Sequence, residues 1–159
     1  MKGPVICIAL LLCAARPPAN AQGEGGTAYV PVERFDPGRD AAKDIGSAVT
    51  EARRSGRRVL LDVGGEWCIW CRRLDTLFVT HPELAEYRNA HYVTVKVNWS
   101  KENKNEQVLS RYPPVSGYPH LFVLGDDGTL IRSQNTGELE KGKGHDPDKV
   151  MTFLRTWAP

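Results

Sequence analysis

The sequence contains few cysteines, and their number limits what they can do. Four occur among 159 residues: Cys7 and Cys13 near the start, and Cys68 and Cys71 in the middle. A small exported domain held together by disulfides needs more than this. A structural zinc site takes four ligands, and the four histidines follow no zinc-finger spacing. The sequence therefore argues against a disulfide scaffold, and we predict no bound metal.

A long hydrophobic run is absent as well. The apolar stretch at residues 5–15 is far shorter than the roughly 20 residues of a membrane-spanning helix. It follows a charged tip and precedes the small residues of Ala19-Asn20-Ala21, a pattern typical of a secretory signal peptide. We expect residues 1–21 to be cleaved after Ala21, residues 22–28 to form a flexible leader, and residues 29–159 to form one domain. The mature protein would then be periplasmic or secreted.

Excess charge is the third feature that the sequence lacks. The full chain has a formal net charge of +2, from 21 basic and 19 acidic residues. Removing residues 1–21 takes away Lys2 and Arg16 and no acidic residue, so the mature charge would be zero. A neutral domain has no general attraction for nucleic acid or anionic lipid. We therefore predict no nucleic-acid partner.

Signal cleavage would leave Cys68 and Cys71 as the only cysteines. Cys13 could instead carry a lipid, but this would need a small residue before it, and Leu12 is not small. A lipid anchor is therefore disfavoured.

Hydrophobic periodicity predicts helices and strands that alternate along the chain. A buried parallel strand reads as a continuous apolar run, and a hairpin reads as two such runs around a Gly-Asp-Asp-Gly turn. The expected elements are a helix at 40–54, a strand at 59–63, a helix from Cys68 that restarts at a capping box at 80–83, a strand at 93–97, a helix at 100–111, a hairpin of 121–124 and 129–132, and a helix at 146–157. This order predicts an α/β fold, a three-layer sandwich around a central mixed sheet.

Cys68 and Cys71 carry the most specific chemical signal. Cys68 follows a strand and begins a helix, where free backbone N–H groups and the helix dipole favour a thiolate. Cys71 lies three residues on, on the same helical face and within reach of a disulfide. We expect Cys68 to attack a substrate and Cys71 to resolve the mixed disulfide. An inert structural disulfide remains an alternative, although so small a loop adds little stability.

Asp62 interrupts an otherwise apolar strand. Burial without a partner is costly for a carboxylate, so the pKa of Asp62 should be raised, and its carboxyl group could exchange a proton with Cys71 through a water molecule. A buried ion pair with no catalytic role is the alternative.

Four motifs resemble the thioredoxin family. Residues 61–72 look like the strand, loop and active-site helix of that family. Lys96-Val97-Asn98 matches its lysine-bearing strand, residues 115–119 match its cis-proline loop, and Asp127-Gly128 matches its hairpin turn. Four motifs in the right order are far more specific than a lone Cys-x-x-Cys. The resemblance covers roughly residues 40–157 and implies a thioredoxin fold.

The resemblance implies roles for further residues. Pro119 should follow a cis bond beside the cysteines, and the backbone of Tyr118 should pair with an extended substrate segment. Lys96 should hold the charge of Asp62. Among such proteins, an exported chain is most similar to the periplasmic thiol–disulfide oxidoreductases. These would act on protein disulfides without a cofactor and would receive electrons from a membrane thiol reductase.

Two departures from the family pattern affect specificity. Residues 99–112 lengthen the connection before the proline loop. The dipeptide between the cysteines is Ile69-Trp70, which lacks acid or charge and favours a reductase or isomerase over a strong oxidant. Trp70 could form an apolar rim with Trp67 for docking a protein chain, or it could pack on its own helix. A binding or chaperone module for extended chains, with idle cysteines, is the competing function.

Overall fold

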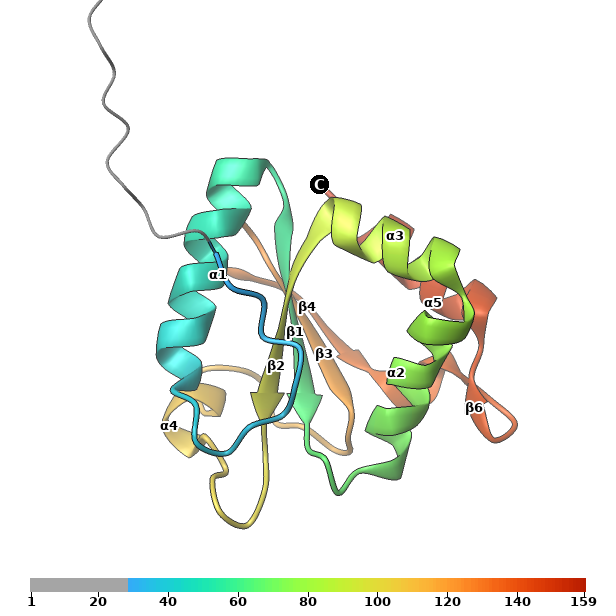
Figure 1. Cartoon of the computed structure of the whole chain (residues 1–159), viewed down its shortest axis with the longest axis horizontal. Helices are drawn as coiled ribbons and strands as arrows, with labels where there is room; N and C mark the ends of the chain where they lie inside the picture. The colour runs from blue at the N-terminus through green and yellow to red at the C-terminus, as the bar shows by residue number, and fades with distance from the viewer. Residues whose placement is uncertain (1–28) are drawn as a thin grey trace, which may run out of the picture.

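The computed structural model describes residues 29–159, so the expected signal peptide and leader lie outside the described residues. A central sheet lies between two layers of helices (Figure 1). The elements in order are α1 (Ala41–Ser55), β1 (Arg58–Gly64), α2 (Ile69–Thr80), α3 (Pro82–His91), β2 (Tyr92–Asn98), α4 (Glu106–Leu109), β3 (His120–Leu124), β4 (Leu130–Asn135), the 3-10 turn η1 (Thr136–Leu139), β5 (Glu140–Lys141), β6 (Gly144–His145) and α5 (Pro147–Thr156).

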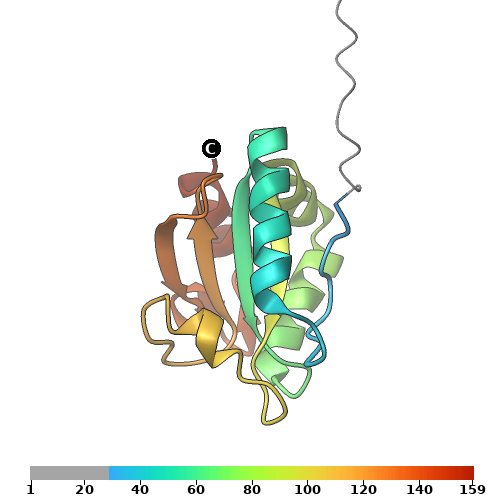
Figure 2. The ribbon, with the colours of Figure 1, turned by 90° about the vertical axis from the view of Figure 1, so that its left-hand side faces the viewer.

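The four long strands lie in the order β2-β1-β3-β4. β1 pairs in parallel with β2, whereas β3 runs antiparallel to both β1 and β4. α1 and α4 cover one face of the sheet, and α2, α3 and α5 cover the other (Figures 1 and 2). The predicted three-layer sandwich with a central mixed sheet is confirmed.

Alternation along β1 separates the two sides of the core. Val59, Leu61 and Val63 belong to the cluster that includes the buried face of α1. Leu60 packs with residues of α2, α3 and α5. Asp62 shares the parity of Leu60 and therefore lies on the face covered by α2.

The predicted helix starts at Asp40 and Asp146 are confirmed, and Gly56 follows the last residue of α1. The Asp40 side chain accepts a hydrogen bond from the backbone of Lys43, and Gly56 adopts φ 67° after α1. Asp146 caps α5, whose first residue is Pro147. The carboxylates of Asp40 and Asp146 satisfy backbone N–H groups that the first turn of each helix leaves free.

The predicted capping box at residues 80–83 does not form. The Thr80 hydroxyl group donates to the carbonyl oxygen of Thr76 at 2.9 Å, so it serves the end of α2. His81 takes the N-cap of α3, and no side chain within residues 29–159 caps that helix there. Threonine readily bonds back to the preceding turn, which competes with capping.

The predicted helix at 100–111 is wrong for most of its length, because only Glu106–Leu109 is helical. Asparagine side chains hold the preceding loop. Asn98 Nδ2 donates to the carbonyl oxygen of Asn103 at 2.8 Å, and Asn105 Nδ2 donates to that of Asn98 at 2.7 Å. Such bonds offer the backbone an alternative to helix.

None of the helices in the described part of the chain is both long and apolar enough to cross a membrane.

Candidate active site

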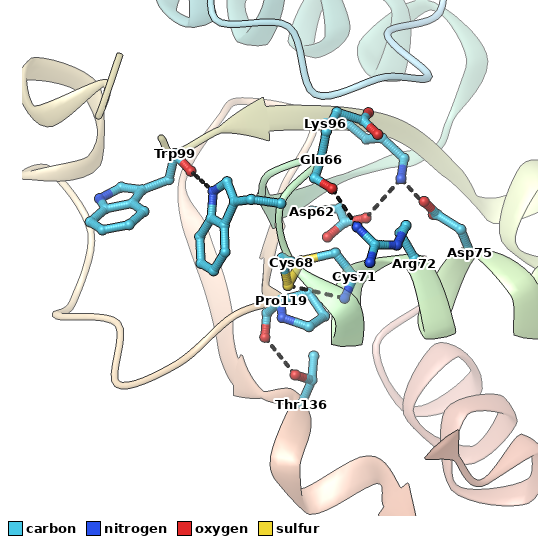
Figure 3. The surroundings of a disulfide bond; sticks show 11 residues. Asp62, Glu66, Cys68, Cys71, Arg72, Asp75, Lys96, Trp99, Pro119 and Thr136 are labelled. Atoms are coloured by element: carbon cyan, nitrogen blue, oxygen red, sulfur yellow. Dashed lines mark hydrogen bonds and ion pairs between the residues drawn. A yellow bond between two sulfur atoms is a disulfide. The ribbon is translucent and has the colours of Figure 1, made fainter. Parts of the chain in front are cut away.

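A disulfide joins Cys68 and Cys71 at the start of α2, with the two Cα atoms 5.2 Å apart (Figure 3). Cys68 is the N-cap residue, and its Sγ atom accepts a hydrogen bond from the backbone N–H of Cys71 at 3.1 Å. Both side chains are buried, Cys71 more deeply than Cys68. An N–H group aimed at Cys68 Sγ, together with the helix dipole, stabilises a thiolate there in the reduced protein.

The end of β1 is shaped to receive the disulfide. A Cβ atom at Gly64 would lie 2.5 Å from Cys71 Sγ, which is closer than real Cβ contacts allow. Gly64 therefore lets α2 approach the strand. Its role was not predicted, because an isolated glycine in a strand does not show what approaches it.

The Tyr118–Pro119 bond is cis, as predicted. Pro119 is buried and lies beside the cysteines (Figure 3). Its carbonyl oxygen accepts a hydrogen bond from the Thr136 hydroxyl group at 2.5 Å. Thr136 thus anchors the proline loop from η1, a contact that no sequence motif indicated.

Three aromatic rings form a wall near the disulfide. Trp67 is 55% exposed, and its ring lies 5.9 Å from the ring centres of both Trp99 and Tyr118. Trp99 and Tyr118 stack at 4.8 Å. Trp67 Nε1 donates to the carbonyl oxygen of Trp99 at 2.8 Å, which fixes the indole against the loop after β2 (Figure 3). The wall combines the active-site loop, the lengthened connection and the proline loop.

Trp70 is not part of this wall, but it packs against the cluster of Phe35, Cys68 and Cys71. Its ring meets the His145 ring edge-on at 5.6 Å, and the Arg73 guanidinium lies 4.4 Å from the indole centre. Trp70 thus contacts Arg73 of its own helix and also lies against the cysteines, so its role at the rim of the site stays a prediction. Trp70 also supports the β5–β6 hairpin, which the sequence did not predict.

Asp62 is buried, as predicted, with 5% of its surface exposed. Burial raises the pKa of Asp62 from its ordinary 3.8 to about 6, and the attraction of Lys96 works against this rise. Lys96 Nζ lies 3.6 Å from Asp62 Oδ2. Asp62 Oδ1 has no hydrogen-bond partner among the described residues. Asp62 and Gly64 lie on the same face of β1, about 6.6 Å apart along the strand. Because Cys71 Sγ approaches Gly64 on this face, the Asp62 carboxyl group lies near Cys71.

Lys96 has a closer partner that the sequence analysis missed. Its Nζ atom is 2.5 Å from Asp75 Oδ1 on α2 (Figure 3). Helical spacing is a signal that could have found it, because Asp75 is four residues after Cys71 and therefore on the same helical face. Lys96 thus bridges a buried carboxyl group and a half-exposed one.

The remaining charged and imidazole groups play smaller parts. Glu66 and Arg72 lie exposed at the rim, where Arg72 Nη1 donates to the carbonyl oxygen of Glu66 at 2.6 Å. His120 and His145 are buried, and burial lowers the pKa of each. Within residues 29–159, no group of three or more His, Cys, Asp or Glu side chains is placed to hold a metal ion.

Comparison with known proteins gives a consistent result. A family model described as thioredoxin-like matches residues 40–125. The thiol:disulfide interchange protein DsbD of Pseudomonas fluorescens is 31% identical over 117 residues, which is 72% of this chain and 18% of that protein. The chain thus spans less than a fifth of the length of this relative. The disulfide bond reductase DsbH of Chlamydia pneumoniae is 24% identical over 80 residues, covering 45% of this chain and 48% of that protein.

A solved structure shows the same fold. The disulphide isomerase from Xylella fastidiosa Temecula1 superposes with a TM-score of 0.67 at 23% sequence identity, covering 77% of this chain and 94% of that chain. The thioredoxin fold expected from the sequence is confirmed.

Proposed function

Because the chain belongs to the thioredoxin-like family, we propose that it is a thiol–disulfide oxidoreductase that acts on protein substrates through Cys68 and Cys71. The observation that carries the proposal is the disulfide at the N-terminus of α2, with the Cys71 N–H group aimed at Cys68 Sγ. The named activity of the DsbD relative, thiol:disulfide interchange, supports it.

The proposed reaction transfers two electrons to the substrate. In the reduced protein, the Cys68 thiolate attacks a substrate disulfide, forms a mixed disulfide and releases one substrate thiolate, which takes up a proton. Cys71 gives its proton to Asp62 and attacks Cys68 Sγ. The second substrate sulfur leaves and is protonated, and the Cys68–Cys71 disulfide remains. A dithiol donor must then reduce it, and we propose a membrane thiol reductase for this step.

The surroundings of the disulfide favour an extended protein segment as substrate. The aromatic wall offers apolar area beside the sulfur atoms, and exposed tryptophan and tyrosine are typical of binding surfaces. Pro119 has no N–H group that could compete for the thiolate. We propose that the backbone of Tyr118 pairs with a substrate strand.

We propose an exported, periplasmic protein that works as a reductase or isomerase. Its relatives named as a disulfide bond reductase and a disulphide isomerase support this direction. Ile69 and Trp70 bring no acid or charge between the cysteines, so the Cys68 thiolate lacks the extra stabilisation of a strong oxidant.

The decisive experiment is the reduction potential of the Cys68–Cys71 pair against a glutathione buffer. We expect a value more reducing than about −200 mV, together with reduction of a disulfide-linked test protein when a dithiol donor is supplied. A Cys68→Ser variant is the matched control and should be inactive. A potential near the roughly −120 mV of strong periplasmic oxidants would overturn the direction. Absence of exchange would overturn the proposed activity itself.

The exposed Trp67 ring favours one alternative, a binding or chaperone module for extended chains. A variant with serine at both Cys68 and Cys71 separates the two functions. The alternative requires full binding of an unfolded test protein by this variant and no disulfide reduction by the wild type.

A further inference from the structure

Phe35 lies outside the predicted elements but inside the active site. It belongs to the segment before α1, and its side chain is 4% exposed. The ring packs in one cluster with Cys68 and Cys71. A Cβ atom at Gly64 would lie 2.5 Å from Cys71 Sγ and 3.2 Å from the tip of the Phe35 ring. The ring and the sulfur atom therefore flank the same point at the end of β1.

The same ring covers the buried charges. Lys96 Nζ lies 4.3 Å from its centre, within the range of a cation–π contact. Lys96 in turn contacts Asp62 and Asp75. Phe35 thus lies against both the cation that faces the buried carboxyl group and the resolving Cys71.

Contacts on two sides hold Phe35 in place. Its segment runs beside β2 (Figures 1 and 2), where Val32 bridges Val95 and the backbone N–H of Lys96 donates to the carbonyl oxygen of Val32 at 3.1 Å. The N–H group of Phe35 donates to Glu66 Oε1 of the active-site loop at 3.3 Å. The position of the ring is therefore set by β2 on one side and by the active-site loop on the other.

Asp62, Asp75 and Lys96 form a charge cluster. Solvent reaches it from a direction other than that of the Phe35 ring. A surface groove has a lining that includes Glu33, Asp75, Arg88 and Lys96. Among the described residues, neither Phe35 nor Cys71 lines this groove. Water therefore has access to one end of the cluster, while the Phe35 ring covers the end at Cys71. Asp62 is buried and is not part of the lining of this groove.

We propose that Phe35 is a positioning residue that keeps bulk water out of the space between Asp62 and Cys71, so that the proton of Cys71 passes to Asp62. The inference rests on the proposed thiol–disulfide exchange. In the resolution step, Cys71 loses its proton to the Asp62 carboxylate as its sulfur atom attacks the mixed disulfide. Excluding water leaves Asp62 as the base within reach and strengthens its electrostatic coupling to the sulfur.

The ring also helps to set the protonation of Asp62. Burial is the largest cause of the raised pKa of Asp62, and the charged groups that face it are Lys96 on β2, Asp75 on α2 and Arg88 on α3. All three remain when Phe35 is replaced. Opening the space should therefore move the pKa of Asp62 down through hydration alone.

The test follows the resolution step in single turnover. Reduced protein is mixed with an aromatic disulfide reagent, and the second coloured thiolate is released when Cys71 attacks the mixed disulfide at Cys68. The rate is measured across pH for the wild type, Phe35→Ala, Asp62→Asn and the double variant. Val32→Ala is the matched control, because Val32 is an equally buried residue of the same segment but packs on the α1 side.

In the wild-type background, we expect Asp62→Asn to slow resolution about 100-fold, as loss of a general base does. In the Phe35→Ala background, we expect the same substitution to slow resolution less than about 10-fold, because water can take the proton. The pH midpoint of the rate should fall by about one unit in Phe35→Ala and stay unchanged in Val32→Ala. An equal effect of Asp62→Asn in both backgrounds, or an unchanged midpoint in Phe35→Ala, would overturn the inference.

A second variant separates the effect of removing the ring from an effect of misfolding. Phe35→Leu keeps an apolar side chain and should show a smaller shift in the same direction, whereas an unchanged profile contradicts the proposal. The outcomes also separate the two claims. If the wild type forms no mixed disulfide or does not resolve it, the proposed function fails together with the inference. If it resolves normally and the Phe35 variants behave like it, only the inference fails.

Discussion

At Asp62, the cost of burying a single carboxyl group makes stability depend on pH. Its pKa is about 6 in the folded protein, against an ordinary 3.8. Between these values the folded state binds more protons than the unfolded state, so stability falls as pH rises. One pKa unit corresponds to about 1.4 kcal/mol, so the free energy of unfolding falls by about 3 kcal/mol in total once the pH is well above 6.

We therefore predict that Asp62→Asn is more stable than the wild type at pH 7, and that its advantage shrinks by about 2 kcal/mol between pH 7 and pH 4. The asparagine does not titrate, and Lys96 keeps Asp75 as a partner. Urea unfolding of both proteins across this range measures the difference. An advantage that does not change with pH would mean that Asp62 titrates normally.

Cys68 and Cys71 should behave differently when each is replaced. The Cys71 N–H group points at Cys68 Sγ, so Cys68 should have the lower pKa and attack first. We predict that Cys71→Ser accumulates mixed disulfides with protein substrates and that Cys68→Ser accumulates few or none. Non-reducing gels and alkylation at mildly acidic pH measure this. Faster labelling of Cys71 in the wild type would reverse the two roles.

The sequence reveals some of these residues and hides others for physical reasons. Asp62 stands out because one carboxylate in an apolar strand is costly wherever the strand lies. Asp75 looks like any polar residue of an amphipathic helix; its spacing from Cys71 places it on the same helical face, but the contact with Lys96 depends on the fold. Phe35 lies before the first periodic segment, so no pattern connects it to Cys71.

Among the elements, periodicity works best where burial is strongest. β1 is apolar on both faces, and α1 has a clear stripe between a capping Asp40 and Gly56, so both could be predicted almost to the residue. The stretch at 100–111 is polar except for Val108 and Leu109, and its local structure depends on asparagine side chains that bond to the backbone. The β5–β6 hairpin has two residues in each strand, too short for an alternating pattern.

The lengthened loop after β2 should select protein substrates. Trp99 brings this loop to the aromatic wall, where its ring stacks on Tyr118 and its carbonyl oxygen holds Trp67. We predict that Trp99→Ala lowers kcat/KM for a protein disulfide about 10-fold, because stacking and apolar contact area are lost. A small soluble disulfide should react at nearly the wild-type rate.

Trp157→Ala is the matched control for Trp99→Ala. Trp157 follows α5 and packs against the opposite core cluster, so its loss should reduce stability without changing the preference between substrates. Equal losses on both substrates in Trp99→Ala would assign the loop a purely structural role.

For the molecule as a whole, the functional unit extends beyond the segment that the family model matches. That model begins at residue 40, yet Val32 and Phe35 are each only 4% exposed. Val32 also pairs with Val95 on β2, the strand at one end of the sheet order. Edge strands with free N–H and carbonyl groups invite pairing with other chains. We therefore propose that residues 29–39 are part of the domain, and the start at residue 29 stays a prediction.

A chain that begins at Asp40 should consequently be less stable than one that begins at residue 29. Burying a valine or phenylalanine side chain contributes roughly 1.5–3 kcal/mol, so losing Val32 and Phe35 should lower the free energy of unfolding by about 3–6 kcal/mol. Asp40 still caps α1, so the helix itself should persist. Urea unfolding at pH 7 measures the difference, and light scattering should detect association through the exposed edge of β2. Equal unfolding midpoints for the two chains would place the domain boundary at residue 40 and reduce residues 29–39 to a loosely attached leader.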